Sequence, residues 1–222
     1  MGLSSHELLQ LAIGNYIDDN DRAAELVSSM KRDTSKDYEG KPYIEGFEHF
    51  SISHSDSSWA VLIDERECGL DIQYGRSCDF LSIARRFFNP EDAAAVGGIY
   101  SMGESAEAEA RAEFFRIWTK REALIKALGL SVVSDDFPPV GLYKSAEYNG
   151  ARFYIANIEM PGAPDLFSAI CLDASKDINE KLIYKEMYVN KQKDCAGDCE
   201  RVSRKSHAHC GGGQEAPSRK GI

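Results

Sequence analysis

The chain has 222 residues, 43% hydrophobic and 28% charged, a composition typical of a folded globular protein that excludes wholesale disorder. Its net charge of −10 excludes a general nucleic-acid binder, because such proteins neutralise phosphates with clustered lysine and arginine. No apolar run approaches the roughly 20 residues that span a bilayer. No secretory signal is recognisable either, so we expect a cytoplasmic protein without membrane or nucleic-acid partners.

The first third of the chain predicts one helix and two strands. Apolar residues at helical spacing predict a helix over 6–17, and a polar stretch containing Gly40-Lys41-Pro42 indicates a turn. Residues 53–56 form a polar break before a strand at 59–63. A tight polar connection then leads to a strand at 68–72, so we expect these two strands to pair as a hairpin.

The middle of the chain predicts three helices followed by short strands. The helices are expected over 80–88, from Pro90 onward, and over 107–128, where Gly129 closes the last one. Helices and strands without regular βαβ alternation predict an α+β fold. Three strands are expected after the helices, around 140–143, 152–158 and 167–172.

The composition changes after about Asn190. Residues 191–222 contain seven basic and four acidic residues, three consecutive glycines and few large apolar side chains, so we predict a disordered tail. The tail also holds cysteines and histidines, but their spacing is not that of a usual zinc site. We favour oxidisable thiols in an unfolded tail over a metal centre. The cysteines and histidines of the tail are Cys195, Cys199, Cys210, His207 and His209.

One segment suited to chemistry is Gly69-Leu70-Asp71-Ile72-Gln73. Asp71 and Gln73 are two residues apart on a predicted strand, so they project from the same face. A charge among apolar neighbours is costly unless it is paired or bound to a metal. A satisfied structural aspartate remains the simpler interpretation of Asp71 taken alone.

A second segment lies on the predicted helix over 107–128. Trp118, Glu122 and Lys126 follow one another at intervals of four residues and therefore stack on one face. A surface Glu–Lys pair is the simple alternative. Because this column lies beside the apolar stripe of the helix, a metal and a phosphate suit it better. A third segment, Ser53-His54, gains meaning only together with the others.

Taken in this order, the segments resemble the 4′-phosphopantetheinyl transferase superfamily, in its two-lobed, surfactin-synthetase-activating branch. The family pattern runs G-K-P, S-H, G-[IV]-D-[IV]-E and W-x-x-K-E-A/S-x-x-K, then a glycine, and the resemblance covers about residues 5–175. Two positions depart from the pattern: Gln73 replaces the second metal carboxylate, and Arg121 replaces a lysine. The part that precedes Lys41 is also short for the family.

The resemblance implies an α+β fold with two pseudo-symmetric α/β lobes, residues 1–67 and 68–190, and an active site in the cleft between them. It implies a monomer that transfers 4′-phosphopantetheine from coenzyme A to a serine of an apo acyl or peptidyl carrier protein. Mg²⁺ would be the cofactor and coenzyme A the co-substrate. A non-catalytic coenzyme A or carrier-binding module, and an unrelated Mg²⁺-dependent phosphohydrolase, are the alternatives.

The resemblance also implies roles for individual residues. Glu122 would accept the proton of the carrier serine, and Lys126 would neutralise charge on the leaving phosphate. Trp118 would pack and fix the helix. The implied metal ligands are Asp71, Gln73 and Glu122, and the implied coenzyme-binding residues are Lys41, Ser53, His54, Arg121 and Lys126.

Overall fold

The computed structural model describes residues 4–32, 40–130, 137–160, 163 and 165–175, together with the backbone of 184–190 and 201–207. The chain divides into two compact units, residues 1–177 and 178–222. The second unit holds the antiparallel strands β9 (Tyr184–Asn190) and β10 (Arg201–His207). The first unit holds α1 (Ser5–Ile17), α2 (Asn20–Ser28), β1 (Lys31–Arg32), β2 (Pro42–Tyr43), β3 (His49–Ser55), β4 (Ser58–Asp64), β5 (Cys68–Tyr74), α3 (Phe80–Phe87), α4 (Pro90–Tyr100), the 3₁₀ turn η1 (Glu104–Ala106), α5 (Glu107–Leu128), β6 (Ser145–Tyr148), β7 (Ala151–Asn157) and β8 (Leu166–Asp173).

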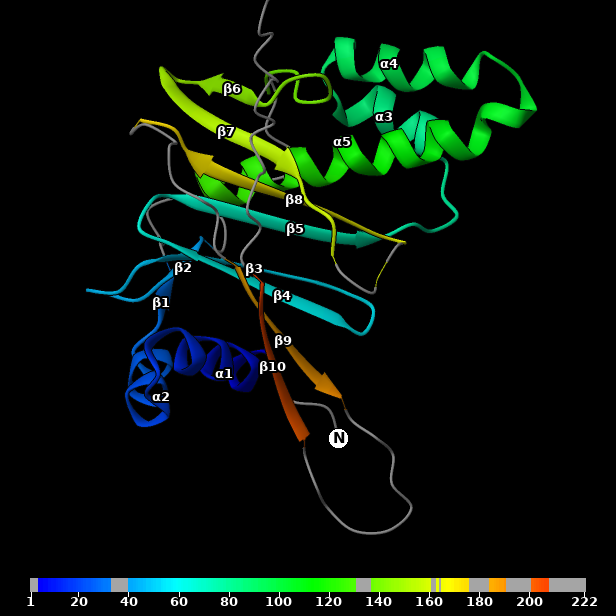
Figure 1. Ribbon diagram of the computed structural model, residues 1–222. Helices are drawn as coiled ribbons and strands as arrows, with labels where there is room; N and C mark the ends of the chain where they lie inside the picture. Colours follow the sequence, from blue (N-terminus) through cyan, green and yellow to red (C-terminus); the bar gives the residue numbers. More distant parts are fainter. Residues whose placement is uncertain are drawn as a thin grey trace, which may run out of the picture. The chain divides into compact units, whose positions relative to one another are not determined.

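The centre of the first unit is a four-stranded antiparallel sheet in the order β5-β8-β7-β6. Helix α5 lies against this sheet, and α3 and α4 lie on the far side of α5 (Figure 1). Aromatic and aliphatic side chains fill the layer between helices and sheet, among them Phe114, Phe115, Leu124, Phe153 and Ile155. Helices packed on an antiparallel sheet confirm the predicted α+β character.

A hairpin of β3 and β4 covers the other face of β5 and β8. Leu70 and Ile72 of β5 pack with Ala60 and Leu62 of β4 in a second apolar cluster. The outer face of the hairpin is covered by α1 and α2 in a third cluster. The hairpin is therefore enclosed between two helices on one side and the larger sheet on the other. The lobe boundary predicted at residue 67 falls within this first unit, just before β5.

Local signals at helix ends agree with the predicted helices. Ser4 and Glu7 form a capping box at the start of α1, which satisfies backbone N–H groups that have no partner within the helix. Helix α4 begins at Pro90, and the Asn89 side chain accepts the N–H of Glu91. Helix α5 ends at Gly129, whose φ of 59° is the left-handed conformation that glycine adopts without strain.

Three sequence predictions about strands are wrong, and one helix was missed. The strand at 59–63 does not pair with the strand at 68–72: β4 pairs with β3, and β5 pairs with β8. The supposed polar break at 53–56 is mostly β-strand, because its serines alternate along one face of β3. The third wrong strand is the one expected at 140–143, because β6 begins only at Ser145. Helix α2 was not predicted at all.

Within the part of the chain predicted as a disordered tail, the structure describes the strand β10. Strand β10 pairs with β9 over seven residues, from Arg201 opposite Asn190 to His207 opposite Tyr184. The residues Cys195, Cys199, Cys210 and His209, considered above for metal binding, lie outside the described residues. Within the described helices, none combines the length and apolar character needed to cross a bilayer.

Candidate active site

The close approach of α5 to β5 depends on a glycine. A Cβ atom built at Gly69 would overlap the carbonyl oxygen of Ala123 and lie 2.6 Å from the backbone nitrogen of Ala127. Side chains alternate along a strand, so residues 69, 71 and 73 lie on the same side of β5. Because Gly69 admits the helix backbone, Asp71 on the same strand comes within reach of α5 side chains.

Asp71 is the centre of a buried polar cluster formed by β3, β5 and α5. Its side chain is only 7% exposed, and its Oδ1 atom accepts hydrogen bonds from Lys126 Nζ at 2.7 Å and from Ser53 Oγ at 2.9 Å. Lys126 Nζ also lies 2.9 Å from Ser53 Oγ. Burial raises the pKa of the Asp71 carboxyl, and the Lys126 charge opposes that shift.

Glu122 is a second carboxylate, one helical turn before Lys126, and its side chain is 12% exposed. Among the described residues, its Oε1 atom is buried without a hydrogen-bond partner, and Arg121 Nη1 lies 4.0 Å away. Burial, together with the neighbouring charge of Asp71, raises the pKa of the Glu122 carboxyl to about 7. Two carboxylates that repel each other in a buried site are a natural place for a cation.

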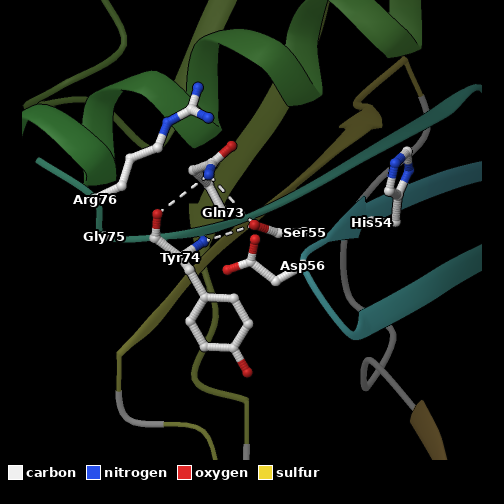
Figure 2. A pocket seen from close by; sticks show the side chains of 7 residues that line it. All are labelled: His54, Ser55, Asp56, Gln73, Tyr74, Gly75 and Arg76. Atoms are coloured by element: carbon white, nitrogen blue, oxygen red, sulfur yellow. Dashed lines mark hydrogen bonds between the residues drawn. The ribbon is translucent and has the colours of Figure 1, made fainter. Parts of the chain in front are cut away.

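Gln73 lies two residues beyond Asp71, beside a small surface pocket. Its Nε2 donates to Ser55 Oγ at 3.3 Å and to the backbone oxygen of Tyr74 at 3.1 Å (Figure 2). His54 is exposed at this pocket, on the opposite side of β3 from Ser53. The pocket is lined by His54, Ser55, Asp56, Gln73, Tyr74, Gly75 and Arg76.

Lys41 does not join the other candidate residues. Its Nζ donates to Glu67 Oε2 at 2.7 Å and to the backbone oxygen of Cys68 at 2.8 Å, so it lies at the start of β5. Gln73 is five residues farther along the strand, or roughly 16 Å at about 3.3 Å per residue. The structure therefore places Lys41 and the pocket of His54 at opposite ends of β5.

Arg121 also lies apart from the pocket. Its side chain is 5% exposed, and its guanidinium carbon lies 4.8 Å from the centre of the Phe137 ring. Burial lowers the pKa of this arginine. In this position Arg121 packs on an aromatic ring and does not face the pocket, unlike the coenzyme-binding role that the resemblance implies.

Sequence analysis missed a ladder of serine side chains between β3 and β5. The two strands belong to different sheets, so the outward N–H groups of β5 have no backbone partner in β3. Three serine hydroxyls accept them instead. Ser51 accepts the N–H of Leu70, Ser53 that of Ile72, and Ser55 that of Tyr74, at 2.9, 3.1 and 2.9 Å. The signal in the sequence was the alternating Ser-x-Ser-x-Ser pattern.

Two buried charged side chains, Lys120 and Asp92, hold the segment between α5 and β6, and sequence analysis missed both. Lys120 Nζ donates to the backbone oxygens of Val140 and Gly141 at 3.1 and 2.8 Å. The Asp92 carboxylate accepts the N–H groups of the same two residues at 2.9 and 2.8 Å. Both side chains are at least nine-tenths buried. Side chains thus hydrogen-bond the backbone groups of a segment for which the sequence predicted a strand.

We expect Asp92→Ala to lower the free energy of unfolding by about 2–3 kcal/mol, because two buried N–H groups lose their acceptor. Its neighbour provides a control: Glu91 accepts a hydrogen bond from the exposed Tyr143 hydroxyl, and Glu91→Ala should cost less than about 1 kcal/mol. Urea unfolding of both variants measures the difference. Equal losses would show that Asp92 does not hold the segment.

The donor set at the Asp71 cluster fits a hard divalent cation. Carboxylate and amide oxygens are the protein ligands that Mg²⁺ prefers, and the buried Glu122 Oε1 lacks a partner among the described residues. Only two carboxylates meet here. Accordingly, no group of three or more His, Cys, Asp and Glu side chains suited to a metal occurs in the described part of the chain.

Comparison with known proteins identifies the same region. Residues 67–154 match the model of the 4′-phosphopantetheinyl transferase superfamily. The chain is 32% identical over 90 residues to the 4′-phosphopantetheinyl transferase gsp of Aneurinibacillus migulanus, a match that covers 40% of this chain and 35% of that protein. It is 38% identical over 88 residues to AcpT of Salmonella typhi (36% and 40%) and 35% identical over 103 residues to HetI of Nostoc sp. (42% and 40%), both also 4′-phosphopantetheinyl transferases.

The matched region has clear limits. The matches span 35% to 40% of the length of these relatives. Asp71, Gln73, Glu122 and Lys126 lie within residues 67–154, whereas Ser53 and the other candidates of β3 precede them. Over this region, the chain is similar to the 4′-phosphopantetheinyl transferase superfamily.

Proposed function

We propose that this protein transfers 4′-phosphopantetheine from coenzyme A to a serine of an apo acyl or peptidyl carrier protein. The observation that carries the proposal is the meeting of Asp71, Glu122 and the partly exposed Lys126 in one cluster inside the region shared with known transferases. Transfer of a phosphoryl-type group needs positioning and neutralisation of charge more than covalent chemistry. Two carboxylates and an ammonium group supply those requirements.

Asp71 and Glu122 would hold Mg²⁺ in this proposal. When bound, the ion would neutralise the pyrophosphate of coenzyme A. Gln73 lies on the same strand face as Asp71, and its amide nitrogen is engaged by Ser55 and Tyr74, so its oxygen is the atom available to the site. Mg²⁺ commonly keeps several waters where few carboxylates bind it, which suits a site with one amide.

The protein side chains would act on both the attacking serine and the leaving group. The carrier serine oxygen attacks the phosphorus that bears the pantetheine, and the bond from that phosphorus to the leaving adenosine 3′,5′-bisphosphate breaks. Glu122 would accept the serine proton, directly or through a water. Lys126, whose Nζ lies beside Asp71, would neutralise the negative charge that builds on the leaving group.

The surface pocket beside the cluster is the proposed entry for the coenzyme. His54 and Arg76 line it and are both exposed, so either can reach a phosphate. Lys41 would contribute there only from the far end of β5, and the buried Arg121 only by leaving Phe137. As part of the proposal we keep the two-lobed arrangement with its cleft, the monomeric state and the cytoplasmic location.

The direct test is to incubate the protein with coenzyme A, Mg²⁺ and a panel of apo carrier proteins, and then to measure the carrier mass. We expect one carrier at least to gain the mass of a single phosphopantetheine group, and EDTA to prevent the gain. Binding of coenzyme A without any mass gain would favour a non-catalytic module. Loss of phosphate from the coenzyme with an unchanged carrier would favour a phosphohydrolase.

A further inference from the structure

The serines of the ladder between β3 and β5 differ in their contacts. Ser51 and Ser53 are each 4% exposed, and each accepts one backbone N–H of β5, at 2.9 and 3.1 Å. Only Ser53 also touches charged side chains, at 2.9 Å from Asp71 Oδ1 and 2.9 Å from Lys126 Nζ. The two serines are therefore matched in burial and in the backbone bond, and differ in their contact with the candidate active site.

The Ser53 hydroxyl has no capacity left for a ligand. A hydroxyl offers one donor and two acceptor positions. The hydrogen goes to Asp71, and the two lone pairs accept the N–H of Ile72 and the ammonium of Lys126. With every position used and the side chain buried, Ser53 is not placed to bind coenzyme A, the role that the resemblance implies for it.

We propose that Ser53 is a positioning residue that fixes the Asp71 carboxylate and the Lys126 ammonium relative to the backbone of β5. The inference rests on the proposed function, because it takes Asp71 as a metal ligand. A carboxylate with one oxygen held by Ser53 cannot rotate freely, so its second oxygen keeps a constant direction. Hydrogen bonds of this kind orient metal ligands, and their loss typically costs about 10- to 100-fold in metal affinity or activity.

The test compares Ser53→Ala with Ser51→Ala and with Ser53→Thr, which keeps the hydroxyl. The first readout is binding of Mn²⁺, followed by the electron paramagnetic resonance of the free ion, because Mn²⁺ takes the same oxygen ligands as Mg²⁺. The second readout is the Mg²⁺ dependence of carrier modification. Thermal unfolding of each variant separates a loss of folding from a loss of positioning.

Both alanine variants should unfold at lower temperatures, since each leaves one N–H of β5 without its acceptor, and Ser53→Ala should lose more because it also removes the hydrogen bonds to Asp71 and Lys126. Only Ser53→Ala should bind Mn²⁺ about tenfold or more weakly, and Ser53→Thr should recover most of the binding. Equal Mn²⁺ affinity of the two alanine variants would overturn the proposal, as would a wild type that binds no Mn²⁺. A wild type that binds Mn²⁺ but modifies no carrier would refute the proposed function, while the Mn²⁺ comparison would still decide the role of Ser53.

Discussion

Glu122→Gln should abolish most of the transferase activity without weakening the fold. The variant keeps the size of the side chain but loses the charge and the proton acceptor, so we expect the rate of carrier modification to fall by at least about 100-fold. Glu122 Oε1 is buried without a hydrogen bond among the described residues and lies 4.0 Å from Arg121 Nη1, so the substitution breaks no hydrogen bond at that atom. Carrier mass spectrometry and thermal unfolding measure the two effects.

The stability effect of Glu122→Gln should also depend on pH in EDTA-treated protein. The carboxyl pKa is raised to about 7 in the folded protein, mainly by burial, from an ordinary value of 4.5. The folded state therefore holds the proton more tightly, and wild-type stability falls as the pH rises through this interval. Glutamine does not titrate, so the melting temperature of the variant relative to wild type should increase between pH 5 and pH 8.

Glu109→Gln is the matched control on the same helix. Glu109 is 61% exposed and pairs with Arg116 on the surface, away from the cluster. We expect the activity of this variant to stay at the wild-type level. Loss of activity in both variants would point to a general effect on α5, and normal activity in Glu122→Gln would remove Glu122 from the reaction.

Apart from α2, the helices were predictable from sequence because their signals are local. The cap at Asn89, the proline that follows it and the left-handed Gly129 lie within a few residues of the ends they define. Strand pairing was not predictable in the same way. Cys68 of β5 lies opposite Leu172 of β8, about a hundred residues later, and no local pattern specifies that partner.

The candidate site was predictable to a similar extent. Asp71 and the Glu122–Lys126 column were identified from the face each shares on its own element, and the structure brings them together. The direction of Ser53 was not predictable, because it depends on which strand lies beside β3. The same holds for Lys41: its distance from His54 follows from where the chain enters β5, which spacing along the sequence does not fix.

Of the substitutions considered, Gly69→Ala should lower the free energy of unfolding most, and it should also disturb the candidate active site. The added methyl group would meet backbone atoms of Ala123 and Ala127, which cannot move aside as a flexible side chain can. We expect the free energy of unfolding to fall by at least about 3 kcal/mol, the upper part of the range for overpacked cores. In the fraction that remains folded, α5 must shift away from β5, which separates Lys126 from Asp71 and lowers the transfer rate.

Gly98→Ala provides a control of the opposite sign. Gly98 lies within α4, and a Cβ atom built there has no other atom within 4 Å. Alanine in a helix interior is favoured over glycine, so this variant should be more stable by about 0.5–1 kcal/mol. Urea unfolding of both variants, with carrier modification at a temperature where both are folded, measures the contrast. If Gly69→Ala were as stable and as active as wild type, the contact between α5 and β5 would not be what brings Lys126 to Asp71.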